Sequence, residues 1–188
     1  MSEAQKIYDQ CAQAYGYAYS IVESMAGAVA EMQKQRGKEF NPNITMAKFD
    51  IVLQYSLLQL AVADNHFDAS EVVFVSNLTH KGDLLSYANA TTKSSLKWED
   101  LYHADIQTVR KFVAAYENIM IQLSDEVVAV IGLCDKATEH DYLADLTKAI
   151  SAIIAGLVLI DGDARRDEVE EPLLILRTIN RIKEYKNQ

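Results

Sequence analysis

The chain has 188 residues, 49% hydrophobic and 24% charged, which is the balance of a soluble globular protein long enough to bury a core. Its formal net charge of −9 argues against nucleic acid and anionic membrane as partners, because both favour basic surfaces. Only 7 Gly and 2 Pro are present, which favours helices over turn-rich sheets. Cys11 and Cys134 lie far apart without metal-ligand spacing, so we expect neither a structural zinc site nor a disulfide.

The sequence shows no targeting or membrane-spanning pattern. Residues 1–6 lack the basic and then apolar order of a signal peptide. The longest apolar run, 149–160, contains Ser151 and Gly156 and is too short to cross a bilayer. We therefore expect a cytoplasmic protein without a transmembrane segment.

Residues 2–36 are predicted to form one long helix, with Ser2 and Gln5 as a capping pair at its start. A seam of mainly Ala and Tyr follows the alternating four-three spacing of one helix face. Its members are Tyr8, Ala12, Tyr15, Tyr19, Val22, Ala26 and Val29. This composition suits close packing, either inside the chain or in a homodimer through the N-terminal helix.

Residues 37–43 form the clearest break, because Gly37 and Asn41-Pro42-Asn43 are typical of turns. Thr45 is predicted to cap an apolar helix over Met46–Ala63, which is expected to be buried on most sides. A turn at 64–67 then leads into a helix from Asp68 to about Thr79.

The second part of the chain is also predicted to be helical. After a break at 81–83, a polar loop is expected over 89–95, then a helix over 98–123 that is interrupted near 103–105. Ser124-Asp125-Glu126 reads as a new helix start. A second apolar helix is predicted over Glu139–Ile160, and a final helix runs from Glu168 to about Tyr185.

The two apolar helices end in similar acidic turns. An Asp follows each apolar run, a turn-forming residue comes next, and a Glu stands seven positions after the Asp in the following helix. The first copy carries Asp64, Asn65 and Glu71, and the second carries Asp161, Gly162 and Glu168. Equal spacing in both halves indicates an internal duplication.

Ala63-Asp64-Asn65…Glu71 and Ile160-Asp161-Gly162…Glu168 resemble the motif of the TerB-like family, which is named for tellurite resistance. The resemblance covers roughly residues 45–185. It implies an all-α, multihelical domain with two related halves around two central apolar helices. We expect a helix at 1–40 packed on a single domain at 41–188, with half-repeats at about 45–80 and 139–185. The resemblance also implies a function in tellurite resistance or another stress response.

Two interpretations of the acidic turns remain open. Helix capping explains the first turn, where Asp68 and Glu71 have capping-box spacing. The resemblance implies metal binding, and carboxylate oxygens suit calcium, magnesium or manganese. The candidate ligands are Asp64, Asp68, Glu71, Asp161, Asp163 and Glu168. If the halves differ, we expect tighter binding in the second, because Arg165 replaces the capping Asp there while the Asp161 and Glu168 pair remains.

The functional prediction is a non-enzymatic cytoplasmic protein that binds a divalent cation through both turns, since no catalytic motif is recognisable. The alternative is a metal-free module for protein–protein interaction, whose acidic face docks a basic partner. Residues 125–171 supply that face, with twelve Asp and Glu against four Lys and Arg. His66 lies inside the first turn and is interpreted as a solvated residue.

Overall fold

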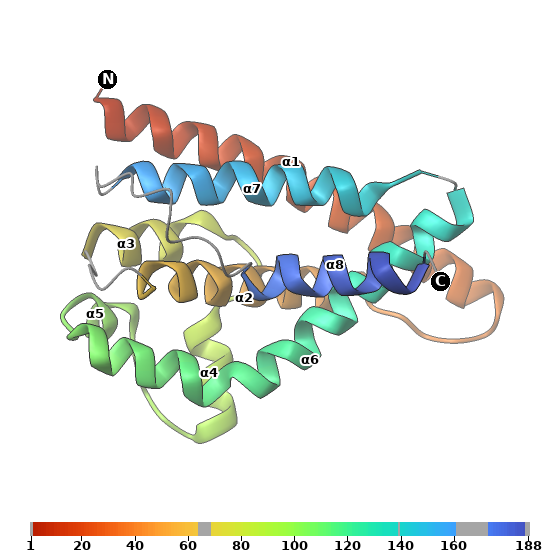
Figure 1. Ribbon diagram of the computed structural model, residues 1–188. Coiled ribbons are helices and arrows are strands. Elements are labelled where there is room, and N and C mark those ends of the chain that lie inside the picture. The colour runs from red at the N-terminus through yellow and green to blue at the C-terminus, as the bar shows by residue number, and fades with distance from the viewer. Residues whose placement is uncertain (1, 64–68, 139, 161–172, 187–188) are drawn as a thin grey trace.

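The computed structural model describes residues 2–63, 69–138, 140–160 and 173–186. These residues form eight helices and no strand, which confirms the all-α prediction (Figure 1). The helices are α1 (Glu3–Gln35), α2 (Pro42–Ala61), α3 (Ala69–Leu78), α4 (Leu84–Thr92), α5 (Trp98–Tyr102), α6 (Ile106–Thr138), α7 (Tyr142–Ile160) and α8 (Leu174–Lys186).

Helix α1 begins where the sequence predicts, because the Ser2 hydroxyl accepts a hydrogen bond from the Gln5 amide at 3.2 Å. Most of the predicted seam is buried or half-buried, although Ala12 is exposed. A second buried row lies beside the seam and was not predicted. This row consists of Cys11, Ala18, Ile21 and Met25. Two buried rows allow α1 to contact α7 on one side and α2 on the other.

The connection between α1 and α2 is tightly specified. Gly37 has φ +68°, and the amides of Gly37 and Lys38 bond to the Lys34 and Gln33 carbonyls at 3.0 and 2.9 Å. This is a Schellman motif, which needs a left-handed residue and so favours glycine. Asn41 then caps α2, with Pro42 in its first turn. The prediction that Thr45 caps this helix is therefore wrong, and Thr45 is buried inside α2.

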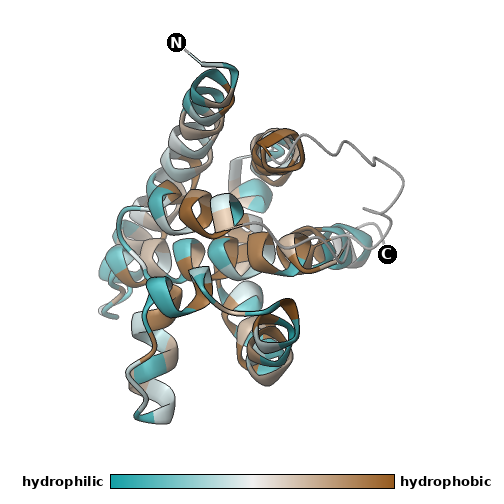
Figure 2. Ribbon diagram, turned by 90° about the vertical axis from the view of Figure 1, so that its left-hand side faces the viewer, coloured by the Kyte–Doolittle hydropathy of each residue, from teal (hydrophilic) through white to brown (hydrophobic). Residues whose placement is uncertain are grey.

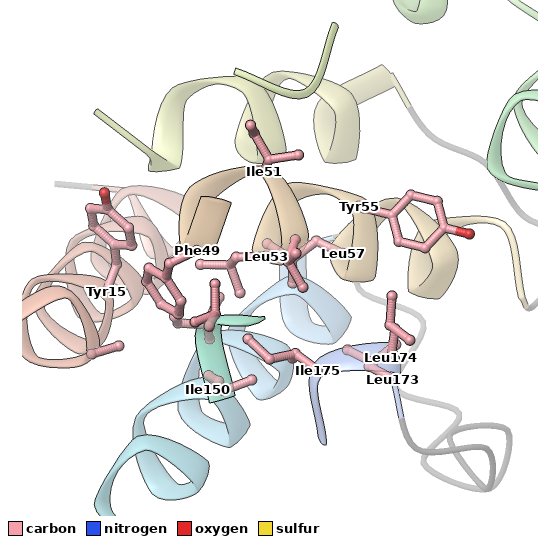
Figure 3. Close-up of a cluster of buried hydrophobic side chains, with 14 of the residues drawn as sticks. Tyr15, Phe49, Ile51, Leu53, Tyr55, Leu57, Ile150, Leu173, Leu174 and Ile175 are labelled. Atoms are coloured by element: carbon pink, nitrogen blue, oxygen red, sulfur yellow. The ribbon is translucent and has the colours of Figure 1, made fainter. Parts of the chain in front are cut away.

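Helix α2 is the centre of the molecule and is buried on nearly every side. It contacts α1, α3, α4, α6 and α8. In Figure 3, Phe49 and Leu53 point towards Ile150 of α7 and Ile175 of α8, whereas Ile51 points to the opposite side. A helix surrounded in this way has no polar face, which explains the apolar run in its sequence.

Helix α6 continues through Ser124-Asp125-Glu126, so the predicted helix start there is wrong. The Ser124 side chain is turned inward and bonds to the Thr178 hydroxyl of α8 at 2.9 Å. A serine in this position serves packing between helices and cannot also cap a helix end. The break predicted near 103–105 is present, between α5 and α6.

The polar loop predicted at 89–95 is also partly wrong, because α4 extends to Thr92. The Asn89 side chain instead holds the following connection. Its carbonyl oxygen accepts from the Leu96 amide at 2.9 Å, and its amide group donates to the Leu96 carbonyl at 2.7 Å. Asparagine here closes a turn from within the helix that precedes it.

Helix α7 packs along α1, so it covers the core rather than lying at its centre like α2. A Cβ added to Gly156 would lie 1.9 Å from the Cys11 sulfur, so the two helices approach closely there. Among the described helices, α7 alone has the length and composition of a membrane span, with mean hydropathy 2.0. It is predominantly brown in Figure 2, although Leu146, Ile150 and Ile153 are buried in the core.

Candidate functional site

Of the six predicted metal ligands, the structure describes only Glu71. Asp64, Asp68, Asp161, Asp163 and Glu168 lie outside the described residues, as does His66. Glu71 stands in the first turn of α3 and its side chain is only 4% exposed. Acidic residues favour a helix N-terminus through the helix dipole, so this placement suits Glu71 with or without a cation. No group of three His, Cys, Asp or Glu within the described ranges is arranged to hold a metal.

The elements that flank the acidic turns lie at one end of the molecule. Figure 1 shows the C-terminal ends of α2 and α7 on the side where α3 begins, and α3 contacts both helices. The two helix C-termini place partial negative charge at that end, and the N-termini of α1 and α3, which lie on the same side, offset part of it.

A side chain of α6 already binds the end of α2. The Arg110 guanidinium of α6 donates to the Val62 carbonyl at the end of α2 from Nε at 3.1 Å and from Nη2 at 2.8 Å. Arg110 therefore supplies a positive charge to the first helix end. This residue was not identified from the sequence, because its partner lies 48 positions away.

A second polar cluster, also missed in the sequence, surrounds the fully buried carboxylate of Asp50. Oδ1 accepts from the Tyr15 hydroxyl at 2.9 Å. Oδ2 accepts from the amides of Lys81 and Gly82 at 2.7 and 2.9 Å, with the His80 amide at 3.3 Å. Burial first, and then the Asp50 charge, raise the pKa of Tyr15 above its usual range. Tyr15 is therefore a neutral hydrogen-bond donor at physiological pH.

Gln54, one turn after Asp50, extends this cluster. Its side chain accepts from the Leu84 amide at 2.7 Å and donates to the Thr79 hydroxyl at 2.8 Å. Gly82 lies so close to α2 that an added Cβ would stand 2.1 Å from the Ala47 carbonyl oxygen. The cluster fixes the connection between α3 and α4 on α2, and a carboxylate in the middle of an otherwise apolar helix was the signal that could have revealed it.

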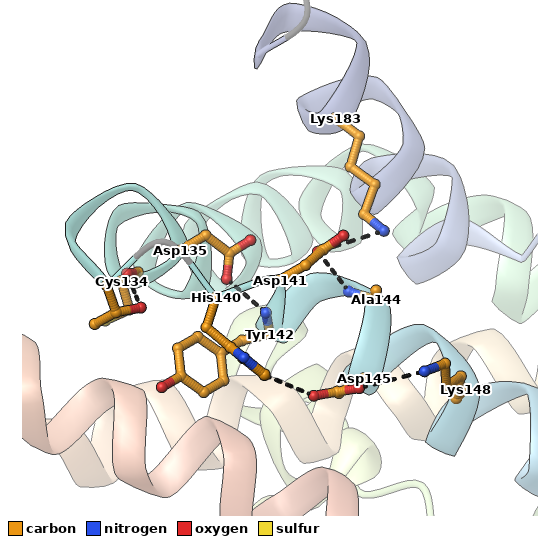
Figure 4. A network of polar contacts seen from close by, with 10 residues as sticks. Cys134, Asp135, His140, Asp141, Tyr142, Ala144, Asp145, Lys148 and Lys183 are labelled. Atoms are coloured by element: carbon orange, nitrogen blue, oxygen red, sulfur yellow. Dashed lines mark hydrogen bonds and ion pairs between the residues drawn. The ribbon is translucent and has the colours of Figure 1, made fainter.

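In the described part of the acid-rich stretch, most carboxylates pair with other residues of the same chain. Asp125 pairs with Arg181, Glu126 with Lys48, and Asp141 with Lys183. Figure 4 shows the second half of this network, in which Asp145 bonds to His140 at 2.9 Å and Asp135 accepts from the Tyr142 amide at 2.8 Å. The hydrogen bond from His140 is the main cause that lowers the pKa of Asp145. These contacts join α6, α7 and α8.

Both cysteines are buried and unreactive in character. Burial raises the pKa of Cys11 to about 11 and also raises the pKa of Cys134. Their sulfurs face the carbonyls of Ile153 and Met25 at 3.8 and 3.5 Å. A thiol with a raised pKa is a poor nucleophile and a poor metal ligand at neutral pH.

Comparison of the chain with protein-family models, curated proteins and solved structures gave no match. The resemblance to the TerB-like family therefore remains a prediction from the sequence motif.

Proposed function

We propose that this protein is a non-enzymatic, TerB-like helical protein that binds a divalent cation through its two acidic turns. Calcium, magnesium or manganese are the ions whose preference for carboxylate oxygens fits the candidate ligands. On this proposal the chain consists of two related halves and acts in the cytoplasm in a tellurite or stress response.

The observation that carries the proposal is the common location of the helix ends. Because α2 and α7 end on the same side of the molecule and both contact α3, the segments that follow them start from the same end (Figure 1). Calcium takes 6–8 oxygen ligands, more than either short turn offers alone. Ligands contributed by both turns satisfy that number.

Arg110 supports the expectation that, in a shared site, the second turn contributes more to cation binding than the first. The guanidinium already places a positive charge at the end of α2 through the Val62 carbonyl. Arg110 repels a cation near the end of α2. The repulsion is weaker for a cation held farther from Arg110, nearer the second turn, because distance and solvent screening reduce it. Asp161, Asp163 and Glu168 follow α7 and belong to the other copy of the motif.

Thermal unfolding of the metal-stripped protein tests the proposal. An ion at about 100 times its dissociation constant stabilises the fold by roughly 2.7 kcal/mol. We expect an ion-selective rise in the midpoint that is lost in Asp161→Asn and Glu168→Gln. Glu23→Gln on the exposed face of α1 is the matched control and should retain the rise.

A rise that persists in both variants would contradict the assignment of ligands. Absence of a rise with calcium, magnesium and manganese would favour the metal-free interaction module.

A further inference from the structure

The surface beside the connection between α1 and α2 carries two adjoining hollows of about 640 and 460 Å³. They share Glu39, Phe40, Asn41 and Ile44, so these residues form a ridge between them. One hollow is bounded by the last two turns of α1. The other is bounded by α6 through Val127, Ala129 and Val130.

The ridge exposes an apolar side chain, and its backbone is fixed by hydrogen bonds on both sides. Phe40 is packed against the core, whereas Ile44 is 52% exposed in the first turn of α2. The Schellman motif at Gly37 and the Asn41 cap fix the backbone on both sides of Phe40. A surface that is already ordered loses little conformational entropy on binding.

The charges around the hollows are balanced, which is unusual in a chain of net charge −9. Lys34, Lys38 and Lys48 stand against Glu31, Glu39 and Glu126. Lys48 pairs with Glu126 across the second hollow. The other four form no ion pair within the described part of the chain.

We propose that this surface, formed by the ridge and its two hollows, binds the same surface of a second copy of the chain. An isologous interface must be self-complementary, since one patch meets itself across a twofold axis. The ridge supplies an apolar projection and the hollows supply its receptor. Two Lys and two Glu side chains that form no ion pair with the described residues are present in equal number. Local neutrality also lets two chains of like net charge approach here.

The charge balance favours a second copy over an acidic or a basic partner. An acidic partner leaves Glu31 and Glu39 facing like charge, and a basic partner does the same to Lys34 and Lys38. A second copy pairs both kinds. The surface lies at the C-terminal end of α1 and differs from the tyrosine seam, most of which is buried inside the chain.

Sedimentation velocity of the full chain over a range of concentrations tests this proposal. Ile44→Asp should weaken self-association by roughly tenfold or more, as expected for loss of a central apolar anchor. Its fold should persist, because an acidic residue in the first turn of a helix is favourable. Tyr17→Asp, at a residue 53% exposed on the middle of α1, is the matched control and should leave the association unchanged.

The double variant Lys34→Glu/Lys38→Glu should weaken the dimer further, because it opposes like charges across the interface. Three results would overturn the proposal: a monomer at the highest soluble concentration, an association insensitive to Ile44→Asp, or an association abolished by Tyr17→Asp. The last result would assign the contact to the outer face of α1.

Discussion

Replacement of Asp50 tests how much of the fold depends on one buried carboxylate. Asp50→Ala removes the acceptor for the Tyr15 hydroxyl and for the amides of Lys81 and Gly82. Each hydrogen bond to a charged group contributes about 1.5–3 kcal/mol, and a buried donor left unpaired carries its own penalty. Because such losses are not additive, we expect a net loss of about 3–5 kcal/mol. That is a large part of a typical unfolding free energy of about 5–15 kcal/mol.

Asp50→Asn separates the hydrogen bonds from the charge. The amide oxygen can replace Oδ2 and accept from Lys81 and Gly82, while the amide nitrogen faces the Tyr15 hydroxyl, which can turn to accept. The charge assistance is lost, and the Tyr15 hydroxyl, whose oxygen also accepts from the His80 amide at 3.2 Å, no longer has an acceptor for its proton, so we expect a cost of about 1–3 kcal/mol. The asparagine variant should therefore lie between wild type and Asp50→Ala.

Urea unfolding followed by circular dichroism measures these differences, provided that the slope with denaturant is unchanged. A cycle of Tyr15→Phe with Asp50→Asn should show a coupling energy of about 0.5–3 kcal/mol. Glu23→Ala on exposed α1 is the control and should stay within about 0.5 kcal/mol of wild type. The reasoning is refuted if Asp50→Ala costs less than about 1 kcal/mol, or if asparagine is as harmful as alanine.

Three further predictions concern close contacts and alkaline pH. Gly82→Ala should cost about 1–3 kcal/mol in urea unfolding, because the new Cβ meets the backbone oxygen of Ala47. Gly156→Ala should also destabilise, and Cys11→Ala should rescue it in a double-mutant cycle by removing the sulfur that it strikes. The free energy of unfolding should be flat from neutral pH to about pH 9 and then fall by a few kcal/mol towards pH 12. Burial raises the pKa of Cys11 from 9.0 to about 11 and that of Tyr55 from 10.0 to about 12, so both favour the fold only while protonated. Tyr55→Phe should reduce that fall.

Local signals in the sequence were sufficient for the start of the first helix and for the turn at Gly37, although Pro42, predicted as part of the break, opens α2. Ser2, Gly37 and Pro42 each act on the backbone within a few residues, and the structure uses them for a cap, a left-handed turn and a first helical turn. Features of this kind are fixed by local stereochemistry and are therefore readable in the chain.

Other predictions failed because a side chain has a distant partner. Ser124 has the appearance of a helix cap in sequence, but Thr178 of α8, 54 positions later, turns it into a packing contact. Asp50 likewise bonds to groups 35 positions before it and about 30 after it. Local propensity does not contain such information, because the same residue type can serve a cap, a turn or a buried cluster.

The charge distribution along the sequence also does not predict which charged side chains are paired in the fold. Asp125, Glu126 and Asp141 lie in the most acidic stretch of the sequence, yet each pairs with a Lys or Arg of α8 or α2. The segment around Gly37 is nearly neutral in sequence, yet its Lys34, Lys38, Glu31 and Glu39 form no ion pair within the described residues. A charged side chain can take part in recognition only if folding has not already paired it. The balanced surface beside Ile44 therefore keeps charges for recognition, whereas Asp125, Glu126 and Asp141 connect α6 and α7 to neighbouring helices.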